Sequence, residues 1–118
     1  MALVFVYGTL KSGYSNHHYL AGQTLVGPAA TKPNYRLFRL EGYPGMVPAE
    51  PGVSVSGEIW EVDQETLIEL DRLEGTEEGL YERRVVSLDQ PWSHLSVETY
   101  LYLRPVEGRP DLGSRYDG

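Results

Sequence analysis

The stretch that decides the fold is Val4-Phe5-Val6-Tyr7-Gly8-Thr9-Leu10-Lys11. The apolar, aromatic run Ala2–Tyr7 predicts a buried first strand that stops at a glycine. Successive backbone N–H groups in a turn of this kind can form a concavity that binds anions, and strand ends are common ligand sites. A phosphate-binding P-loop is excluded because the Gly-Lys-Ser/Thr ending is missing. A turn with only a structural role stays open as the second interpretation.

Glycine and proline interrupt the rest of the chain about every ten residues, which is typical of many short strands joined by turns. Strands are expected at Leu25–Thr31, Tyr35–Leu40, Val53–Val62, Tyr81–Leu88 and Val97–Arg104. Gly42–Pro51 is rich in Gly and Pro and is expected to be a loop or an edge strand, whereas Asn16 is suited to cap a short helix through Leu20. These elements predict an α+β fold, built as a small, mixed, largely closed β-barrel with short flanking helices, because closure would remove exposed edges.

One longer helix is predicted to begin after the N-cap Asp63, with Glu65 in its first turn, to continue through Thr66–Glu74 and to end at Gly75. Its apolar residues Leu67, Ile68, Leu70 and Leu73 share one face, and at 100° per residue Glu74 falls about 20° from the centre of that face. A carboxylate on a buried face is costly, and burial would raise its pKa toward the range a general base or acid needs. A frayed helix end that turns Glu74 to water remains the alternative.

The composition limits the class of protein. A chain of 118 residues, 41% hydrophobic and 23% charged, fits a single domain over residues 1–118, with 105–118 as an extended tail. The net charge of −7 and the scattered basic residues argue against nucleic-acid binding. The short apolar N-terminus predicts neither a signal peptide nor a membrane span. The absence of cysteine excludes thiol chemistry, and a cytoplasmic location is the default expectation.

Other candidate sites are less well supported. His17, His18 and His94 lack the partners and the spacing of a metal site, so no metal is expected. Thr9, Ser12 and Ser15 have no motif that would activate a nucleophile. Tyr81 is suited to line a pocket or simply to belong to a structural strand shared with Arg83, and Tyr43 to form a pocket rim or a Tyr-Pro turn.

The opening stretch resembles the first motif of the gamma-glutamylcyclotransferase-like family, and its gamma-glutamylamine cyclotransferase and AIG2-like branches are the most similar. Leu70-Asp71-Arg72-Leu73-Glu74-Gly75, followed by Tyr81-Glu82-Arg83, resembles the second motif of that family. Gly57–Val62 resembles the strand between them, so the similarity spans most of residues 3–104. The acidic 75–80 loop and the 113–118 tail depart from the family pattern, which bears on the choice of substrate.

The resemblance implies the barrel fold with flanking helices and an enzyme that needs no cofactor. It implies that the backbone of Tyr7, Gly8, Thr9 and Leu10 binds the glutamyl part of a small gamma-glutamyl substrate and that Glu74 is the catalytic acid/base. Tyr81, just past the second motif, is added as an expected substrate-binding residue. The expected reaction releases 5-oxoproline and a free amine by intramolecular aminolysis. The alternative is a non-catalytic module that binds an acidic small molecule in the same cradle.

Overall fold

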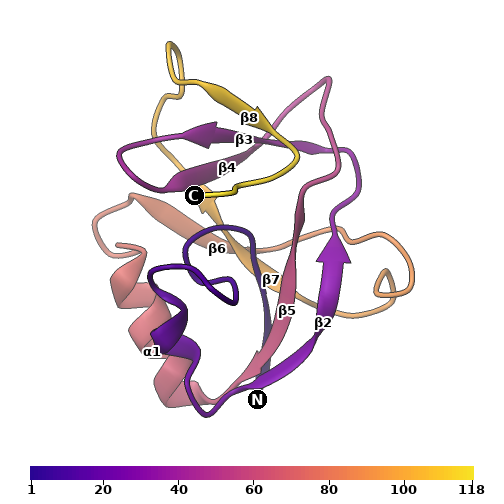
Figure 1. Ribbon diagram of the computed structural model, residues 1–118, viewed down its shortest axis with the longest axis vertical. Coiled ribbons are helices and arrows are strands. Elements are labelled where there is room, and N and C mark those ends of the chain that lie inside the picture. The colour runs from indigo at the N-terminus through magenta and orange to yellow at the C-terminus, as the bar shows by residue number, and fades with distance from the viewer.

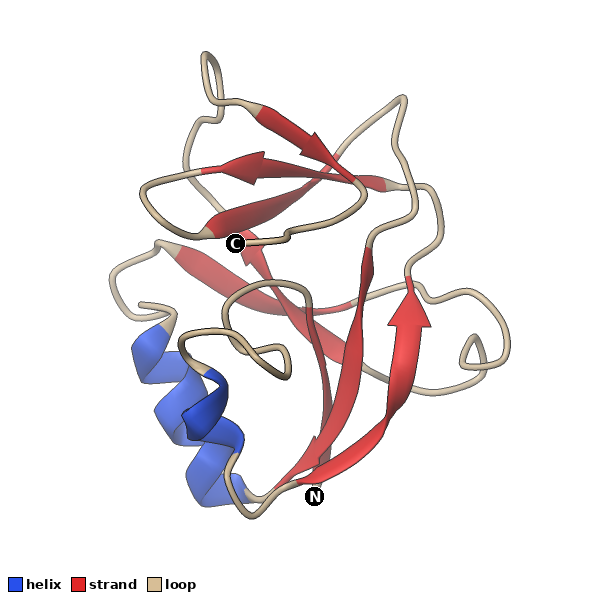
Figure 2. Cartoon of the chain, viewed as in Figure 1, coloured by secondary structure: helices blue, strands red, loops and turns tan.

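A computed structural model describes all residues from 1 to 118. The chain forms eight strands, one α-helix and one short 3₁₀ helix, and these make a mixed α+β fold (Figures 1 and 2). In chain order the elements are β1 (Ala2–Val6), η1 (His17–Leu20), β2 (Thr24–Ala30), β3 (Tyr35–Arg39), β4 (Pro44–Pro48), β5 (Ser56–Val62), α1 (Gln64–Leu73), β6 (Tyr81–Val85), β7 (Glu98–Tyr102) and β8 (Asp111–Gly113).

All eight strands belong to one sheet, which divides at β7. The order is β2-β5-β1-β7-β4-β3-β8, with β6 paired to β7 outside this path. Because β6 pairs along the whole of β7, the strands β1 and β4 share the other edge of β7. Both run parallel to it: Val4 of β1 lies beside Glu98, and Met46 of β4 lies beside Leu101. The strands β1 and β4 therefore separate from one another at the point where β1 ends.

The expected closed barrel is wrong, because the sheet is open and has β2, β8 and β6 as its edge strands. Figure 1 shows β3, β4 and β8 lying apart from β1, β2 and β5. Two of these edges, those of β8 and β2, are limited by other means. Strand β8 has only three residues, and β2 carries Pro28, which has no N–H group to offer to another strand.

The predicted helix is confirmed as α1, and its start follows from the predicted cap. Asp63 Oδ1 accepts a hydrogen bond of 2.8 Å from the Thr66 N–H, which satisfies one of the free donors of the first turn. Gly75, with φ +67°, takes the left-handed conformation that ends the helix. Leu70 is buried as expected, but Ile68 is 47% exposed, because the packed face is narrower than the apolar pattern.

The first strand is buried on both faces, which explains its uninterrupted apolar sequence. Val4 and Val6 pack in a cluster with the buried side chains of α1 and η1. Phe5 and Tyr7 face a second cluster, which includes Met46 of β4. Figure 2 shows α1 and η1 side by side on one flank of the strands. This arrangement brings the end of β1 between the helix and the β3–β4 hairpin.

The structure differs from two other local expectations. Gly42–Pro51 was expected as a loop or an edge strand, but its residues Pro44–Pro48 form β4, which lies between β7 and β3 because its prolines stand only at its two ends. Asn16 precedes η1 without a side-chain cap, because its amide bonds to Thr9 instead. The expected strand regions contain β3, β5, β6 and β7, and the region Leu25–Thr31 overlaps β2 with a shift of one residue. Residues 105–118 include β8 and the buried Tyr116. No helix has the length and apolar character needed to cross a membrane.

Candidate active site

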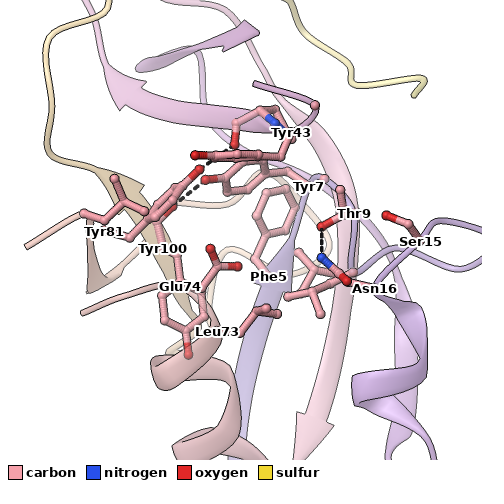
Figure 3. Close-up of a pocket in the computed structure, with 16 residues that line it drawn as sticks. Phe5, Tyr7, Thr9, Ser15, Asn16, Tyr43, Leu73, Glu74, Tyr81 and Tyr100 are labelled. Carbon is pink, nitrogen blue, oxygen red and sulfur yellow. Dashed lines mark hydrogen bonds between the residues drawn. The ribbon is translucent and has the colours of Figure 1, made fainter. Parts of the chain in front are cut away.

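A cavity of about 330 Å³ lies where β1 and β4 separate. Four parts of the chain form its walls: the end of β1 with the following loop, the start of β4, the C-terminal end of α1 and the hairpin of β6 and β7 (Figure 3). No Lys, Arg or His side chain is present among its lining residues, which are Phe5, Val6, Tyr7, Gly8, Thr9, Leu10, Ser15, Asn16, Gly42, Tyr43, Pro44, Leu73, Glu74, Leu80, Tyr81 and Tyr100.

Glu74 supplies the only ionisable carboxyl group in this cavity. It is the C-cap of α1 in a helical conformation, and its N–H donates to the Leu70 carbonyl at 2.9 Å, so the helix does not fray there. Its carboxyl group points into the cavity (Figure 3) and has neither an ion-pair partner nor a hydrogen bond to the protein. Burial raises the pKa of Glu74 from 4.5 to about 7, because loss of hydration disfavours the charged form. The group can therefore both accept and donate a proton near neutral pH.

The loop after β1 offers hydrogen-bond donors that the protein does not use. The backbone N–H groups of Tyr7, Gly8, Thr9 and Leu10 donate to no protein acceptor, although the next N–H, that of Lys11, closes a turn on the Gly8 carbonyl at 3.1 Å. All four residues line the cavity. Unpaired N–H groups in a partly enclosed wall are costly unless a solvent molecule or a ligand accepts from them. Successive free N–H groups in one turn are able to bind an anion.

Gly8 is required by the close approach of β4. A Cβ at this position would lie 2.6 Å from Pro44 Cγ and 2.9 Å from Pro44 Cδ, both well inside van der Waals contact. The backbone of Gly8 is not in the left-handed region, so the reason for glycine is space and not conformational freedom. The glycine lets the loop meet β4 and form a continuous wall.

Asn16 makes the Thr9 hydroxyl available to a ligand. The Asn16 side-chain amide donates to Thr9 Oγ1 at 3.0 Å, and its backbone N–H donates to the Thr9 carbonyl at 2.9 Å. Because Thr9 Oγ1 already accepts one bond, its own proton is free to donate elsewhere. Ser15, also in the wall, has a hydroxyl group with no protein partner. Two signals in the sequence concerned Asn16, namely the expected helix cap and its match to an Asn that often follows the resembled opening motif, whereas none identified Ser15 as a lining residue.

Tyr7 and Tyr81 line the cavity with their rings, while their hydroxyl groups bind backbone. The Tyr7 hydroxyl donates to the Tyr100 carbonyl at 2.6 Å and accepts from the Met46 N–H at 3.2 Å. The Tyr81 hydroxyl donates to the Pro44 carbonyl at 2.8 Å. Burial, together with the nearby Glu74, raises the pKa of both phenols. Both phenols therefore stay neutral near pH 7.

An ion-pair network behind Glu74 was not identified from the sequence. Asp71, three residues before Glu74 on α1, accepts hydrogen bonds from the Tyr100 hydroxyl at 2.7 Å and from Arg83 Nε at 2.9 Å. Arg83 also binds Glu98 of β7 at 2.8 Å. The network joins the C-terminal half of α1 to β6 and β7, and so fixes the end of the helix that carries Glu74. The pairing of Asp71 with Tyr100 joins residues 29 apart, so local spacing could not reveal it.

The histidines do not form a metal site. No group of three or more His, Cys, Asp or Glu side chains is placed so as to hold a metal ion. His17 Nδ1 instead lies 3.0 Å from the Leu10 carbonyl, and its ring packs 5.2 Å from that of Trp60. His17 thereby supports the loop that carries the free N–H groups.

The fold and the cavity define a small α+β domain in which an unpaired carboxyl group and a loop of free N–H donors share one enclosed site. The family model described as gamma-glutamyl cyclotransferase, AIG2-like, matches residues 4–117. The chain belongs to this family.

Relatives and solved structures agree with this assignment. A Vibrio cholerae protein that carries the gamma-glutamylcyclotransferase name is 44% identical over 102 residues, which cover 83% of this chain and 84% of the relative. The Niallia circulans gamma-L-glutamyl-butirosin B gamma-glutamyl cyclotransferase is 33% identical over 88% of this chain and 69% of its own length. The crystal structure of a mouse AIG2-like protein is 30% identical and superposes with a TM-score of 0.75, covering 99% of this chain and 88% of the mouse chain.

Proposed function

We propose that this protein is an enzyme that converts a gamma-glutamyl amine or gamma-glutamyl amino acid into 5-oxoproline and a free amine, with Glu74 as general acid and base. One observation carries the proposal: the unpaired, poorly hydrated Glu74 carboxyl group lies in the same cavity as the free N–H groups of residues 7–10. Membership in the gamma-glutamylcyclotransferase family supports this chemistry, as does the activity named for the Niallia circulans relative.

The reaction begins with removal of a proton from the α-ammonium group of the substrate. An ammonium nitrogen has no free electron pair, so it cannot attack until a base takes this proton. Glu74, with a pKa of about 7, is a carboxylate above that pH and is matched to the task. The freed amine attacks the γ-carbonyl carbon of the same molecule, and holding the two groups together removes much of the entropic barrier.

The second half of the reaction returns protons to the leaving nitrogen. Glu74, now protonated, donates to that nitrogen as its bond to the γ-carbon breaks. The lactam nitrogen keeps one of the three hydrogens of the ammonium group, and the other two balance the protonation of the released amine. One carboxyl group serves both steps because the first transfer regenerates the acid that the second requires.

The loop after β1 is the natural partner for the anionic oxygens of the substrate. The reaction has two such positions, namely the α-carboxylate and the oxygen that develops charge on the γ-carbon. The N–H groups of residues 7–10 and the Thr9 hydroxyl are the available donors, and fixed neutral donors of this kind are effective at stabilising an oxyanion. Because no cation lines the cavity, none is available there to pair with Glu74 and lower its pKa.

The direct test is the release of 5-oxoproline from a panel of gamma-glutamyl amines and dipeptides, measured for the parent, Glu74→Gln and Glu77→Gln. The first variant keeps the shape of the side chain but cannot accept a proton, so turnover should be lost. Glu77 is an exposed carboxylate in the next loop, and its variant should keep parent activity. Substantial turnover by Glu74→Gln would reject the assigned role, and binding without release by the parent would favour a non-catalytic module.

A further inference from the structure

The last residues of the chain pack against two segments that wall the cavity, the loop after β1 and the turn before β4. Beyond β8, the Ser114 carbonyl accepts a hydrogen bond of 2.8 Å from the Ser56 N–H at the start of β5. The following Tyr116 is only 4% exposed. Figure 1 shows this end of the chain between β4 and the loop that follows β1. Residues 114–118 are referred to below as the strap.

Tyr116 lies outside the cavity and joins two of the segments that line it, the β1 loop and the turn before β4. Its carbonyl oxygen accepts a hydrogen bond of 2.7 Å from Lys11 Nζ, and Lys11 directly follows the loop with the free N–H groups. Its hydroxyl group donates to the Gly42 carbonyl at 3.2 Å, in the turn before β4. Leu10 and Gly42 both line the cavity. A single side chain and its own carbonyl thus link the β1 loop to the β3–β4 turn.

The surroundings of Tyr116 hold it in place. Its ring packs against Tyr14 with the ring centroids 5.8 Å apart, and the Arg39 guanidinium lies 5.8 Å from its centroid. Tyr14 belongs to the β1 loop, whereas Arg39 ends β3. The ring therefore contacts the β1 loop and the end of β3, so its packing joins the same two parts of the chain as its hydrogen bonds do.

Lys11 is unusual because it is a buried cation without an anionic partner. Its residue is 7% exposed, and no carboxylate lies within 4.0 Å of its ammonium group. The Tyr116 carbonyl is its one protein acceptor, and the Tyr14 ring lies 4.7 Å away. Burial lowers the pKa of Lys11. Lysine is rarely buried unless it is paired, and replacing it by an apolar residue would relieve this cost, so stability does not explain its presence.

We infer that the strap sets the opening of the cavity, with Tyr116 and Lys11 as positioning residues that hold the β1 loop and the Gly42 turn at the separation the substrate requires. The expected change in KM rests on the proposed function. The expected rigidity of the β1 loop and the Gly42 turn does not depend on turnover. Neither residue lines the cavity, so neither is expected to touch the substrate.

The kinetic test uses Lys11→Met and Tyr116→Phe, each of which removes one of the two links and keeps most of the packing. We expect each to raise KM about tenfold, equivalent to about 1.4 kcal/mol, while kcat stays within about threefold. Tyr35→Phe is the matched control, since its hydroxyl accepts a hydrogen bond of 3.3 Å from the Ser87 N–H and Tyr35 does not line the cavity. It should leave KM unchanged. Parent KM values in both strap variants would overturn the kinetic role.

A second measurement separates failure of the strap from failure of the proposed function. In the parent, backbone ¹⁵N order parameters at Gly8–Lys11 and Gly42 should be those of rigid backbone, about 0.85, and in the two variants they should fall toward about 0.6 at these residues alone. If the parent releases no 5-oxoproline, the proposed function fails, and the order parameters alone then show whether the strap holds the two segments in place. Unchanged order at both segments would overturn the strap even in an active enzyme.

Discussion

The Tyr7 hydroxyl donates a hydrogen bond of 2.6 Å to the Tyr100 carbonyl, across the point where the sheet divides. The same hydroxyl accepts from the Met46 N–H at 3.2 Å. Because β1 and β4 have separated there, backbone groups of β7 and β4 would otherwise lack partners. The phenol thus supplies the hydrogen bonds that a neighbouring strand would otherwise make. A cavity can therefore open at the end of β1 without leaving buried polar groups unsatisfied.

Tyr7→Phe should therefore destabilise the fold more than a tyrosine hydroxyl usually does. The variant leaves the Met46 N–H and the Tyr100 carbonyl without that partner, and the free energy of unfolding should fall by about 1–3 kcal/mol. Urea unfolding at constant pH measures this change. Tyr35→Phe, which removes one longer bond of 3.3 Å, should cost less. Equal losses in the two variants would contradict a special role of Tyr7 at the division of the sheet.

The sequence predicted the elements that depend on local signals. The Asp63 cap, the Gly75 stop and the apolar runs of β1, β5 and β7 follow from neighbouring residues, and the structure confirms them. The closed barrel was wrong because closure depends on which distant strands pair. No local pattern shows that β1 and β4 share one edge of β7.

The residues of the candidate site likewise fall into those that local sequence signals identified and those that they did not. Glu74 stood out because a carboxylate on an apolar helix face breaks a local rule, and Gly8 because a strand stops at a glycine. Tyr100, Asp71 and the strap gave no such signal, since their contacts join residues between 12 and 105 positions apart. The burial of Lys11 was equally invisible, because a lysine after a glycine turn is ordinarily exposed.

Glu74 should make the stability of the protein depend on pH. Its pKa is about 7 in the folded protein and 4.5 as its ordinary value, so the folded state binds this proton more tightly. The contribution to stability is complete below pH 4.5 and is lost as the pH rises through 7, up to about 3 kcal/mol. Glu74→Gln should thus be more stable than the parent at pH 8 and nearly equal to it at pH 4.5.

Chemical unfolding of parent and variant across this range is the measurement. Glu77→Gln changes an exposed carboxylate in the neighbouring loop and should leave the pH dependence of the parent intact. A Glu74→Gln protein whose stability advantage is absent at pH 8 would indicate that the carboxyl group is well hydrated. Glu74 would then lack the raised pKa on which its proposed role as a base depends.

The rate of 5-oxoproline release should show the same ionisation. Only the carboxylate form of Glu74 can accept a proton, so kcat/KM should rise with pH and level off above an apparent pKa near 7. Initial rates at low substrate concentration between pH 5 and pH 9 give the profile. Because this limb belongs to the enzyme, it should stay in place when the leaving amine of the substrate is changed. A limb that moves with the amine would assign the ionisation to the substrate instead.

Asp71→Asn tests whether the network behind Glu74 positions the carboxyl group. Asparagine keeps the size of the side chain but weakens the bonds to Arg83 and to the Tyr100 hydroxyl, which join α1 to the hairpin. The end of α1 should then lose its fixed position, and kcat should fall by about tenfold or more because proton transfer requires close alignment. The acid limb of the pH profile should persist, since Glu74 is still present and still enclosed.

Glu98→Gln is the matched control, because it removes the other partner of the same guanidinium and does not touch α1. We expect both variants to lose about 1–3 kcal/mol of stability, so stability alone cannot separate them. Only Asp71→Asn should lower kcat strongly. If the two variants lower kcat equally, the network acts on the hairpin as a whole, and Asp71 has no particular role in placing Glu74.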